Sequence, residues 1–165
     1  MEKLRFLNTP RLSAGIVTAN RGSLFGPFGF AVTPTERHDE STVAGHRQLL
    51  ADALTLPVER LLFQRQVHGT AVTHAADLLP PSRWRSLGCR NHPASDILIS
   101  DRPGLSLVLS VADCCPVLVY ATDRNVVAAI HAGWRGTAAG AVAAAFESLR
   151  RRYTVDPAKC RCWIG

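Results

Sequence analysis

Long apolar runs and a leader-like start are both missing from this 165-residue sequence. No run approaches the roughly 18–20 apolar residues of a membrane-spanning helix, because the longest apolar stretches contain Asp113 or Arg124. The charged residues 1–5 are not followed by an apolar segment, so no secretory signal is visible. Hydrophobic residues make up 47% of the chain, which excludes a disordered polymer and favours a domain with a buried core. We therefore expect a cytoplasmic protein with no membrane partner.

Cysteine is scarce and odd in number. The five cysteines are Cys89, Cys114, Cys115, Cys160 and Cys162. An odd count, in a chain long enough to bury its own core, argues against a disulfide framework and favours free thiols or metal ligands. Cys160 and Cys162 share one strand face and could bind a metal, although sulfur packing in a core strand is the favoured interpretation.

Acidic residues are fewer than basic ones, 13 against 19, which gives a formal net charge of +6. The arginines are scattered, and only residues 150–152 form a run. That run falls at the predicted C-terminal end of a helix, where cations complement the helix dipole. We therefore expect no nucleic-acid partner. A non-catalytic basic binding module stays an alternative, which nucleic-acid affinity that falls steeply with salt would reveal.

The N-terminal third has little regular patterning. Residues 18–34 are rich in glycine and phenylalanine and are predicted to form an ordered loop. Ser41 or Thr42 is expected to cap a helix that runs to about Leu54. A polar segment over residues 77–93 is expected to be a surface excursion.

The remaining sequence alternates short apolar runs with turn residues. The runs predict strands over residues 61–68, 71–75, 97–99, 105–111, 116–120, 126–130 and 160–164. One alanine-rich helix is predicted over residues 137–152, with arginines at its end. This order of elements indicates an α+β domain with a largely buried sheet.

Metal-binding side chains interrupt the apolar pattern at three strand ends, in residues 66–70, 112–116 and 131–136. Loops held by a rigid scaffold often carry functional residues. Taken singly, His68 fits a turn histidine, Cys114 a small core residue and His131 a strand-end histidine. Taken together, they form a possible Cys-His-His ligand set.

A three-ligand set is typical of catalytic zinc, which leaves its fourth position to water, whereas structural zinc is closed by four ligands. No CxxC or HxxxH spacing is present, so the ligands would come from three separate strands. That arrangement favours a cleft over a zinc finger. Because adjacent strand residues face opposite sides, only one of Cys114 and Cys115 should reach the site.

A glycine-containing turn over residues 133–137 leads into the predicted helix. The N–H groups near Gly136 and Thr137 would lie at the helix start, which is suited to an anion. Arg135 adds a planar fork for phosphate or carboxylate. The alternative is that Arg135 pairs with an acid such as Asp113 and only braces the loop.

These same segments resemble the laccase-domain, or YfiH-type, family, also called polyphenol oxidase or peptidoglycan editing factor. The similarity is carried by residues 66–70, 95–100 with Pro103-Gly104, 112–114 with Pro116, and 131–137. The resemblance implies a single laccase-type domain over residues 1–165 that lacks the family's C-terminal segment. It also implies an α+β fold with α/β/β/α layers and a mixed sheet.

The resemblance further implies a zinc-dependent purine nucleoside phosphorylase with adenosine deaminase activity. Its partners would be phosphate and a small nucleoside such as adenosine, inosine or methylthioadenosine. The family's metal ligands fall on His68, Cys114 and His131, the three residues that the pattern also indicates. Asp113 is the nearest carboxylate by sequence for moving protons in deamination, and orientation of the loop is its alternative role.

Three other activities are weighed against this one. The first is a hydrolase with Cys114 as nucleophile and His131 as base. The second is a hydrolase that edits a peptidoglycan precursor. The third, multicopper oxidation, is disfavoured on two grounds. A blue-copper site usually has an axial methionine, and the only methionine is Met1. A multicopper cluster needs further histidine ligands, and the remaining His38, His46, His74 and His92 include no pair at ligand spacing.

Overall fold

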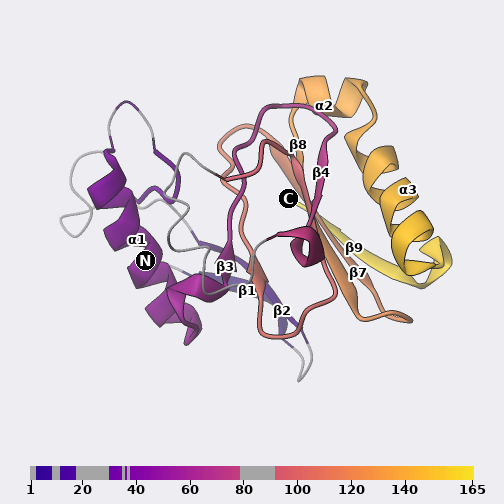
Figure 1. The fold of residues 1–165 in the computed structure, drawn as a ribbon, viewed down its shortest axis with the longest axis horizontal. Coiled ribbons are helices and arrows are strands. Elements are labelled where there is room, and N and C mark those ends of the chain that lie inside the picture. Colours follow the sequence, from indigo (N-terminus) through magenta and orange to yellow (C-terminus); the bar gives the residue numbers. More distant parts are fainter. Residues whose placement is uncertain (1–2, 9–11, 18–29, 35, 37, 79–91) are drawn as a thin grey trace. The chain divides into compact units, whose positions relative to one another are not determined.

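The computed structural model describes residues 3–8, 12–17, 30–34, 36, 38–78 and 92–165 (Figure 1). The chain divides into two compact units, Met1–Arg47 and Gln48–Gly165. The expected loop over residues 18–34 falls largely outside the described residues, as do Cys89 and most of the surface excursion at residues 77–93. Over the part of the chain that is described, no helix is both long and apolar enough to cross a membrane.

The first unit contains an antiparallel pair that the sequence patterns did not predict, β1 (Lys3–Asn8) and β2 (Ser13–Val17). Helix α1 (Glu40–Leu54) begins in this unit. Its start was predicted with the wrong cap, because Asp39 caps it. The Asp39 carboxylate accepts hydrogen bonds from the Thr42 N–H at 2.7 Å and the Ser41 hydroxyl at 3.1 Å.

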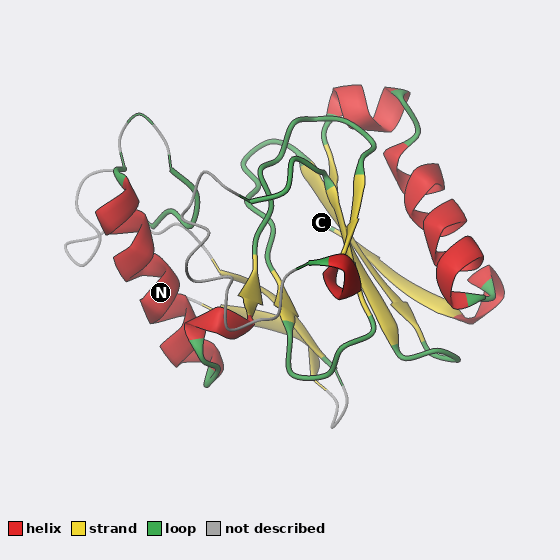
Figure 2. Cartoon of the chain, viewed as in Figure 1, coloured by secondary structure: helices red, strands yellow, loops and turns green. Residues whose placement is uncertain are grey.

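The second unit is built on a mixed five-stranded sheet in the order β4-β5-β8-β7-β9. Figure 2 shows its strands in yellow. The strands are β4 (Val72–His74), β5 (Ile97–Ser100), β7 (Cys115–Ala121), β8 (Val126–Ala132) and β9 (Cys160–Ile164). Within this sheet the β4–β5 pair is parallel and the other three pairs are antiparallel. The predicted α+β class with a mixed sheet is therefore confirmed.

Two apolar clusters cover the two faces of this sheet. Helix α3 (Ala141–Tyr153) packs along one face, where Leu149 is buried with Ile97 and Ile99 (Figure 1). Leu98 alternates to the other face and is buried with Leu62. Leu62 belongs to a short parallel pair, β3 (Leu61–Leu62) and β6 (Ser106–Leu107). Single 3₁₀ turns cover Val58–Arg60, Ala75–Asp77 and Pro157–Lys159.

The prediction of one helix over residues 137–152 is wrong. The chain forms two helices there, α2 (Trp134–Ala138) and α3. Between them Gly140 has a φ of +87°, a left-handed conformation that glycine adopts without strain and that ends a helix. The turn residues 134–138 are therefore a separate five-residue helix.

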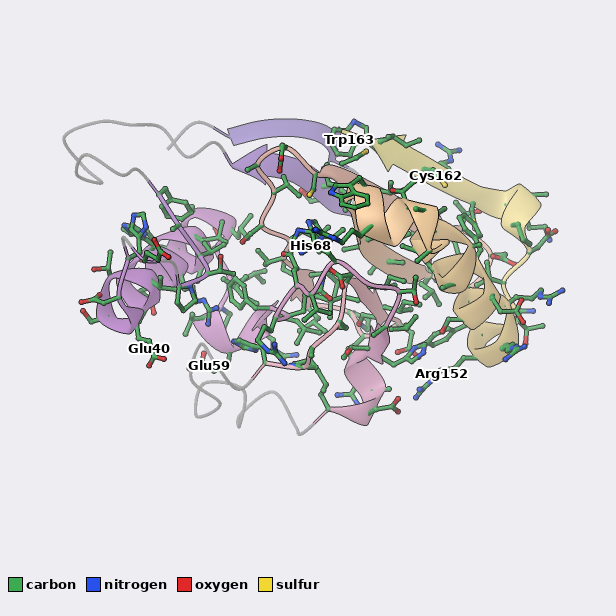
Figure 3. All side chains as sticks on the ribbon, turned by 90° about the horizontal axis from the view of Figure 1, so that it is seen from above. Glu40, Glu59, His68, Arg152, Cys162 and Trp163 are labelled. Atoms are coloured by element: carbon green, nitrogen blue, oxygen red, sulfur yellow. The ribbon has the colours of Figure 1, made fainter. Side chains whose placement is uncertain are left out.

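The arginine run lies in the last turn of α3, as predicted, and its three guanidinium groups contact two carboxylates. Arg150 and Arg151 bind Glu147. Arg152, which Figure 3 labels on the last turn of α3, binds Asp77. These pairs reduce the positive charge that the run offers to an external anion.

Candidate metal centre

The topology of the sheet places four chain segments at one of its ends. Strand β8 is antiparallel to both β5 and β7, so the end of β8 lies beside the starts of the other two. Asp96 immediately precedes β5, Cys114 immediately precedes β7, and His131 is the penultimate residue of β8. Strand β4 is parallel to β5, so the loop that carries His68 reaches the same end.

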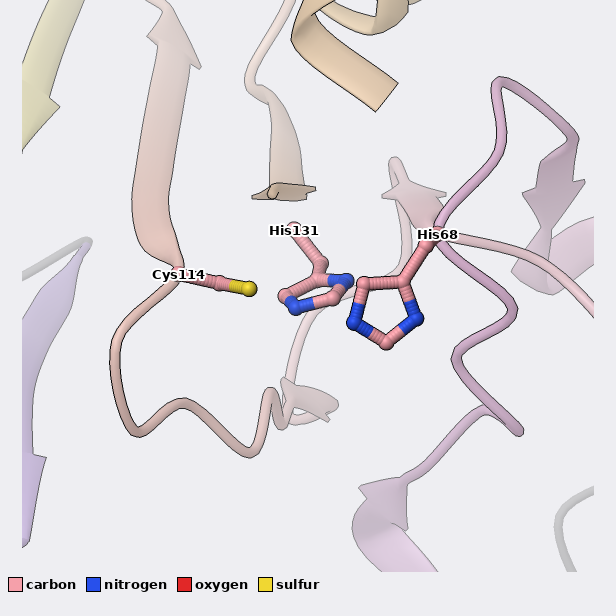
Figure 4. A group of neighbouring side chains, drawn as sticks. All are labelled: His68, Cys114 and His131. Carbon is pink, nitrogen blue, oxygen red and sulfur yellow. The ribbon is translucent and has the colours of Figure 1, made fainter. Parts of the chain in front are cut away.

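His68, Cys114 and His131 form a cluster at this end of the sheet (Figure 4). One potential ligand atom from each lies within 4.8 Å of the others, and all three residues belong to the second unit. The rings of His68 and His131 meet edge to face, with centroids 4.9 Å apart. The structure thus brings together the three residues that the sequence singled out.

His131 is held at both its backbone and its ring. Its N–H donates to the Asp96 carbonyl at 2.8 Å, and its Nδ1 lies 2.8 Å from Asp96 Oδ1. A carboxylate only accepts hydrogen bonds, so Nδ1 carries the proton. The lone pair of Nε2 is then the one available to a metal.

His68 has an unusual backbone conformation, with a φ of +60°. This left-handed region is uncommon for residues other than glycine and persists where the surroundings impose it. Here the N–H groups of Val67, His68 and Gly69 all donate to the Asp96 carboxylate, the last two at 2.9 and 2.7 Å. Asp96 therefore holds the loop in this conformation.

Asp96 was quoted from the sequence only as part of a family motif, and its role in the site was missed. The side chain is fully buried. Burial works to raise its pKa, but hydrogen bonds from Gly69, His131, His68 and Val67 outweigh burial and lower the pKa below the ordinary value of 3.8. The one available signal was a charged residue directly before the apolar run 97–99.

The Cys114 loop is fixed by a side chain from the His68 loop. The Gln66 amide pairs with the backbone of Ser110, donating from Nε2 to the carbonyl at 2.7 Å and accepting from the N–H at 2.9 Å. Burial, followed by the negative charge of Asp113, raises the pKa of the Cys114 thiol. Cys115 Sγ lies instead 3.2 Å from the Gly165 carbonyl, which confirms that only one of the adjacent cysteines joins the cluster.

Two glycines allow segments of the site to approach closely. A Cβ on Gly133 would lie 2.9 Å from Cys114 Sγ and 3.1 Å from His68 Cδ2. A Cβ on Gly136 would lie 3.0 Å from the Gly69 carbonyl oxygen. The 2.9 Å contact at Gly133 is shorter than real Cβ atoms show, and the other two contacts are tighter than most, so the turn after β8 favours glycine for packing.

The residues predicted to contact an anion lie in a different local structure from the one expected. The Thr137 N–H donates to the Gly133 carbonyl at 2.8 Å inside α2, so it does not lie free at the start of a long helix. Arg135 is exposed, and its guanidinium lies 4.4 Å from the centroid of the Trp134 ring. Within the described residues no ion pair joins Arg135 to Asp113, which is also exposed.

The donor set fits zinc. Two imidazoles and one thiolate are ordinary zinc ligands, and three of them leave a position open. Tetrahedral zinc with bonds of about 2.0–2.3 Å would place ligand atoms roughly 3.3–3.7 Å apart, which small side-chain movements reach from a spread of at most 4.8 Å. A blue-copper site would usually add an axial methionine, and the single methionine of the sequence is Met1.

Comparison with known proteins gives a consistent result. A family model described as multi-copper polyphenol oxidoreductase laccase matches residues 13–165. The purine nucleoside phosphorylase YlmD of Geobacillus stearothermophilus is 35% identical over 133 residues, which is 77% of this chain and 46% of that protein. A purine nucleoside phosphorylase of Xylella fastidiosa is 33% identical over 165 residues, covering 96% of this chain and 56% of that protein.

Solved structures show the same relationship. The Bacillus licheniformis hypothetical protein YfiH has a TM-score of 0.80 at 32% identity, over 93% of this chain and 57% of that one. YlmD from Geobacillus stearothermophilus has a TM-score of 0.77 at 30% identity, with the same coverage. The chain spans about half the length of the curated relatives it matches.

Proposed function

The chain belongs to the multi-copper polyphenol oxidoreductase laccase family, in its YfiH-type branch, and we propose that it provides the zinc site of a purine nucleoside phosphorylase. The observation that carries the proposal is the Cys-His-His cluster, in which Asp96 leaves Nε2 of His131 available to a metal. The names of the relatives in Geobacillus stearothermophilus and Xylella fastidiosa support the choice of reaction.

In this proposal His68, Cys114 and His131 hold the metal. When bound, zinc supplies a Lewis acid and lowers the pKa of a water molecule in its open position to about 7. The donor set supports one such centre and not a multicopper oxidase, because no second group of three possible ligands is found among the described residues. Zinc identity, cytoplasmic location and the organisation of residues 1–165 as one domain stay predictions.

Phosphorolysis requires phosphate to bond to C1′ of the ribose while the bond from C1′ to the purine nitrogen breaks, with the electron pair leaving on the base. Phosphate then needs a cation that does not lose its proton. We assign this role to Arg135, whose exposed guanidinium can bind two phosphate oxygens. Any contact from Thr137 would fall to its hydroxyl, because its N–H is already bonded, and Gly136 would contribute its backbone.

For adenosine deamination we assign the proton-moving carboxylate to Asp113. Its Oδ1 lies 3.8 Å from Cys114 Sγ, and its side chain is exposed. Asp96 is unsuited to this role, since it is fully buried and its oxygens already accept four N–H groups. Adenosine, inosine and methylthioadenosine stay the proposed substrates.

The test is a nucleoside panel with and without phosphate. We expect phosphate-dependent release of free base and ribose 1-phosphate, abolished by a chelator and restored by zinc. His68→Ala and Cys114→Ser should each lower kcat/KM by about 100-fold or more, whereas Cys162→Ser, at an exposed position of β9, should behave as the parent. Activity that survives both the chelator and the two ligand variants would contradict the proposal. Inosine formed from adenosine without phosphate would separately test deamination.

A cysteine-nucleophile hydrolase is the second candidate, because the Asp96–His131 pair would also orient a general base for Cys114. It ranks second since the raised pKa of the Cys114 thiol disfavours the thiolate that such a mechanism requires. Iodoacetamide would abolish a thiol activity, including one on a peptidoglycan precursor, while a chelator would leave it intact.

A further inference from the structure

The carboxylate of Asp96 receives hydrogen bonds from two separate segments of the chain. From one side come the N–H groups of Val67, His68 and Gly69, and from the other comes Nδ1 of His131. The backbone of Asp96 adds two more bonds, accepting from the His131 N–H at 2.8 Å and donating to the Ala71 carbonyl at 3.2 Å. One buried residue therefore joins the His68 loop to the end of β8.

The bonds to the His68 loop determine its backbone conformation. Three successive N–H groups converge on one carboxylate, and the middle residue is the one with a φ of +60°. Without the carboxylate these donors would have no anion to surround, and a left-handed conformation at histidine would cost free energy with nothing to offset it. The direction of the His68 ring thus depends on Asp96.

The bond to the ring of His131 determines which nitrogen faces the cluster. An ionised carboxylate offers no proton, so the imidazole must donate from Nδ1. A neutral imidazole has only one N–H, which leaves Nε2 as the lone pair. His131 is 2% exposed, so water does not replace Asp96 as its partner.

We propose that Asp96 is the positioning residue of this centre, setting the His68 backbone and the His131 tautomer through one buried carboxylate. The consequence for metal affinity rests on the proposed zinc site, but the tautomer does not. Asp96 touches neither the metal nor the substrate in this role. The partners of its carboxylate lie 27 to 35 residues away in sequence, so Asp96 links segments that are distant along the chain.

The first test uses the unaltered chain without metal. With ¹⁵N-labelled histidine, NMR at neutral pH should show His131 as the Nδ1–H tautomer, with a protected Nδ1 proton. The Nε2–H tautomer, or rapid exchange between the two, would overturn the proposal. This measurement needs no variant and no zinc, so its outcome is independent of the proposed function.

The second test is Asp96→Asn, with Asp77→Asn as the matched control, because Asp77 is exposed and pairs with Arg152. An amide can present its NH₂ to Nδ1, so His131 should shift toward the Nε2–H tautomer. Zinc affinity, measured by competition with a chromophoric chelator, should fall by about 10–100-fold, and Asp77→Asn should keep the parent affinity.

Thermal unfolding of the metal-free Asp96→Asn variant establishes that it is folded. A folded variant with the parent tautomer and the parent zinc affinity would overturn the proposal. If the parent itself binds no zinc, the proposed function fails, while the NMR result still decides the role of Asp96. If the variant does not fold, the tautomer of the unaltered chain decides it.

Discussion

At the scale of single residues, the cluster depends on a missing side chain at Gly133. This residue follows β8 directly, and a Cβ built on it would contact both Cys114 and His68. Its φ of −70° is accessible to every residue, so its backbone conformation does not require glycine. The requirement is one of space.

Gly133→Ala is therefore expected to separate Cys114 from His68. The added Cβ would lie 2.9 Å from Sγ and 3.1 Å from the imidazole, and relieving both contacts moves at least one ligand. Since a displacement of about 1 Å disrupts a preorganised site, we expect zinc affinity to fall by about tenfold or more. Competition with a chromophoric chelator measures the change.

Gly45→Ala is the matched control, because no atom lies within 4 Å of the position of its Cβ. Gly45 lies inside α1, where alanine should stabilise the helix by about 1 kcal/mol. Zinc affinity should be unaltered in this variant. A zinc affinity in Gly133→Ala equal to that of the parent would contradict the requirement for space at this position.

At the scale of elements, two of the predicted strands are largely loops around the cluster, and side chains bind the backbone of these loops. The predicted strand over residues 105–111 is reduced to Ser106–Leu107, and the one over 61–68 to Leu61–Leu62. The Gln66 amide and the Asp96 carboxylate bind backbone groups that a strand ladder would otherwise pair. These contacts aim Cys114 and His68 at one point.

Gln66→Ala should loosen the Cys114 loop without unfolding the sheet. The substitution removes two hydrogen bonds to Ser110. If their loss makes ordering of the loop less favourable by about 1.4 kcal/mol of free energy, zinc binding weakens by about tenfold. Hydrogen exchange at the Ser110 N–H should accelerate in the same variant. Gln48→Ala, which removes an exposed contact with Asp52 on α1, should alter neither quantity. Unchanged exchange at Ser110 would contradict the role given to Gln66.

How far the fold could be predicted depends on whether local sequence decides an element. Strands β5, β7 and β8 were predicted to within two residues at each end, because each is a continuous apolar run. The helix break was missed although Gly140 is visible in the sequence, since the alanine-rich stretch on both sides favours helix. The clustering of His68, Cys114 and His131 was predicted from residue types at strand ends, and the structure confirms that these residues lie together. The role of Asp96 was not predicted, because its partners lie 27 to 35 residues away.

At the scale of the whole chain, every residue of the candidate centre lies in the second unit, Gln48–Gly165. The curated relatives in Geobacillus stearothermophilus and Xylella fastidiosa are about twice as long as this chain. The proposed ligand set can be tested on this chain alone.

Zinc K-edge X-ray absorption of the zinc-loaded chain tests that ligand set most directly. We expect one sulfur at about 2.3 Å and nitrogen or oxygen ligands at about 2.0–2.1 Å completing four-fold coordination. The sulfur should vanish in Cys114→Ser and persist in Cys162→Ser, since only the first of these thiols joins the cluster. A zinc shell with no sulfur, or with two or more, would place the metal on other residues and contradict the account.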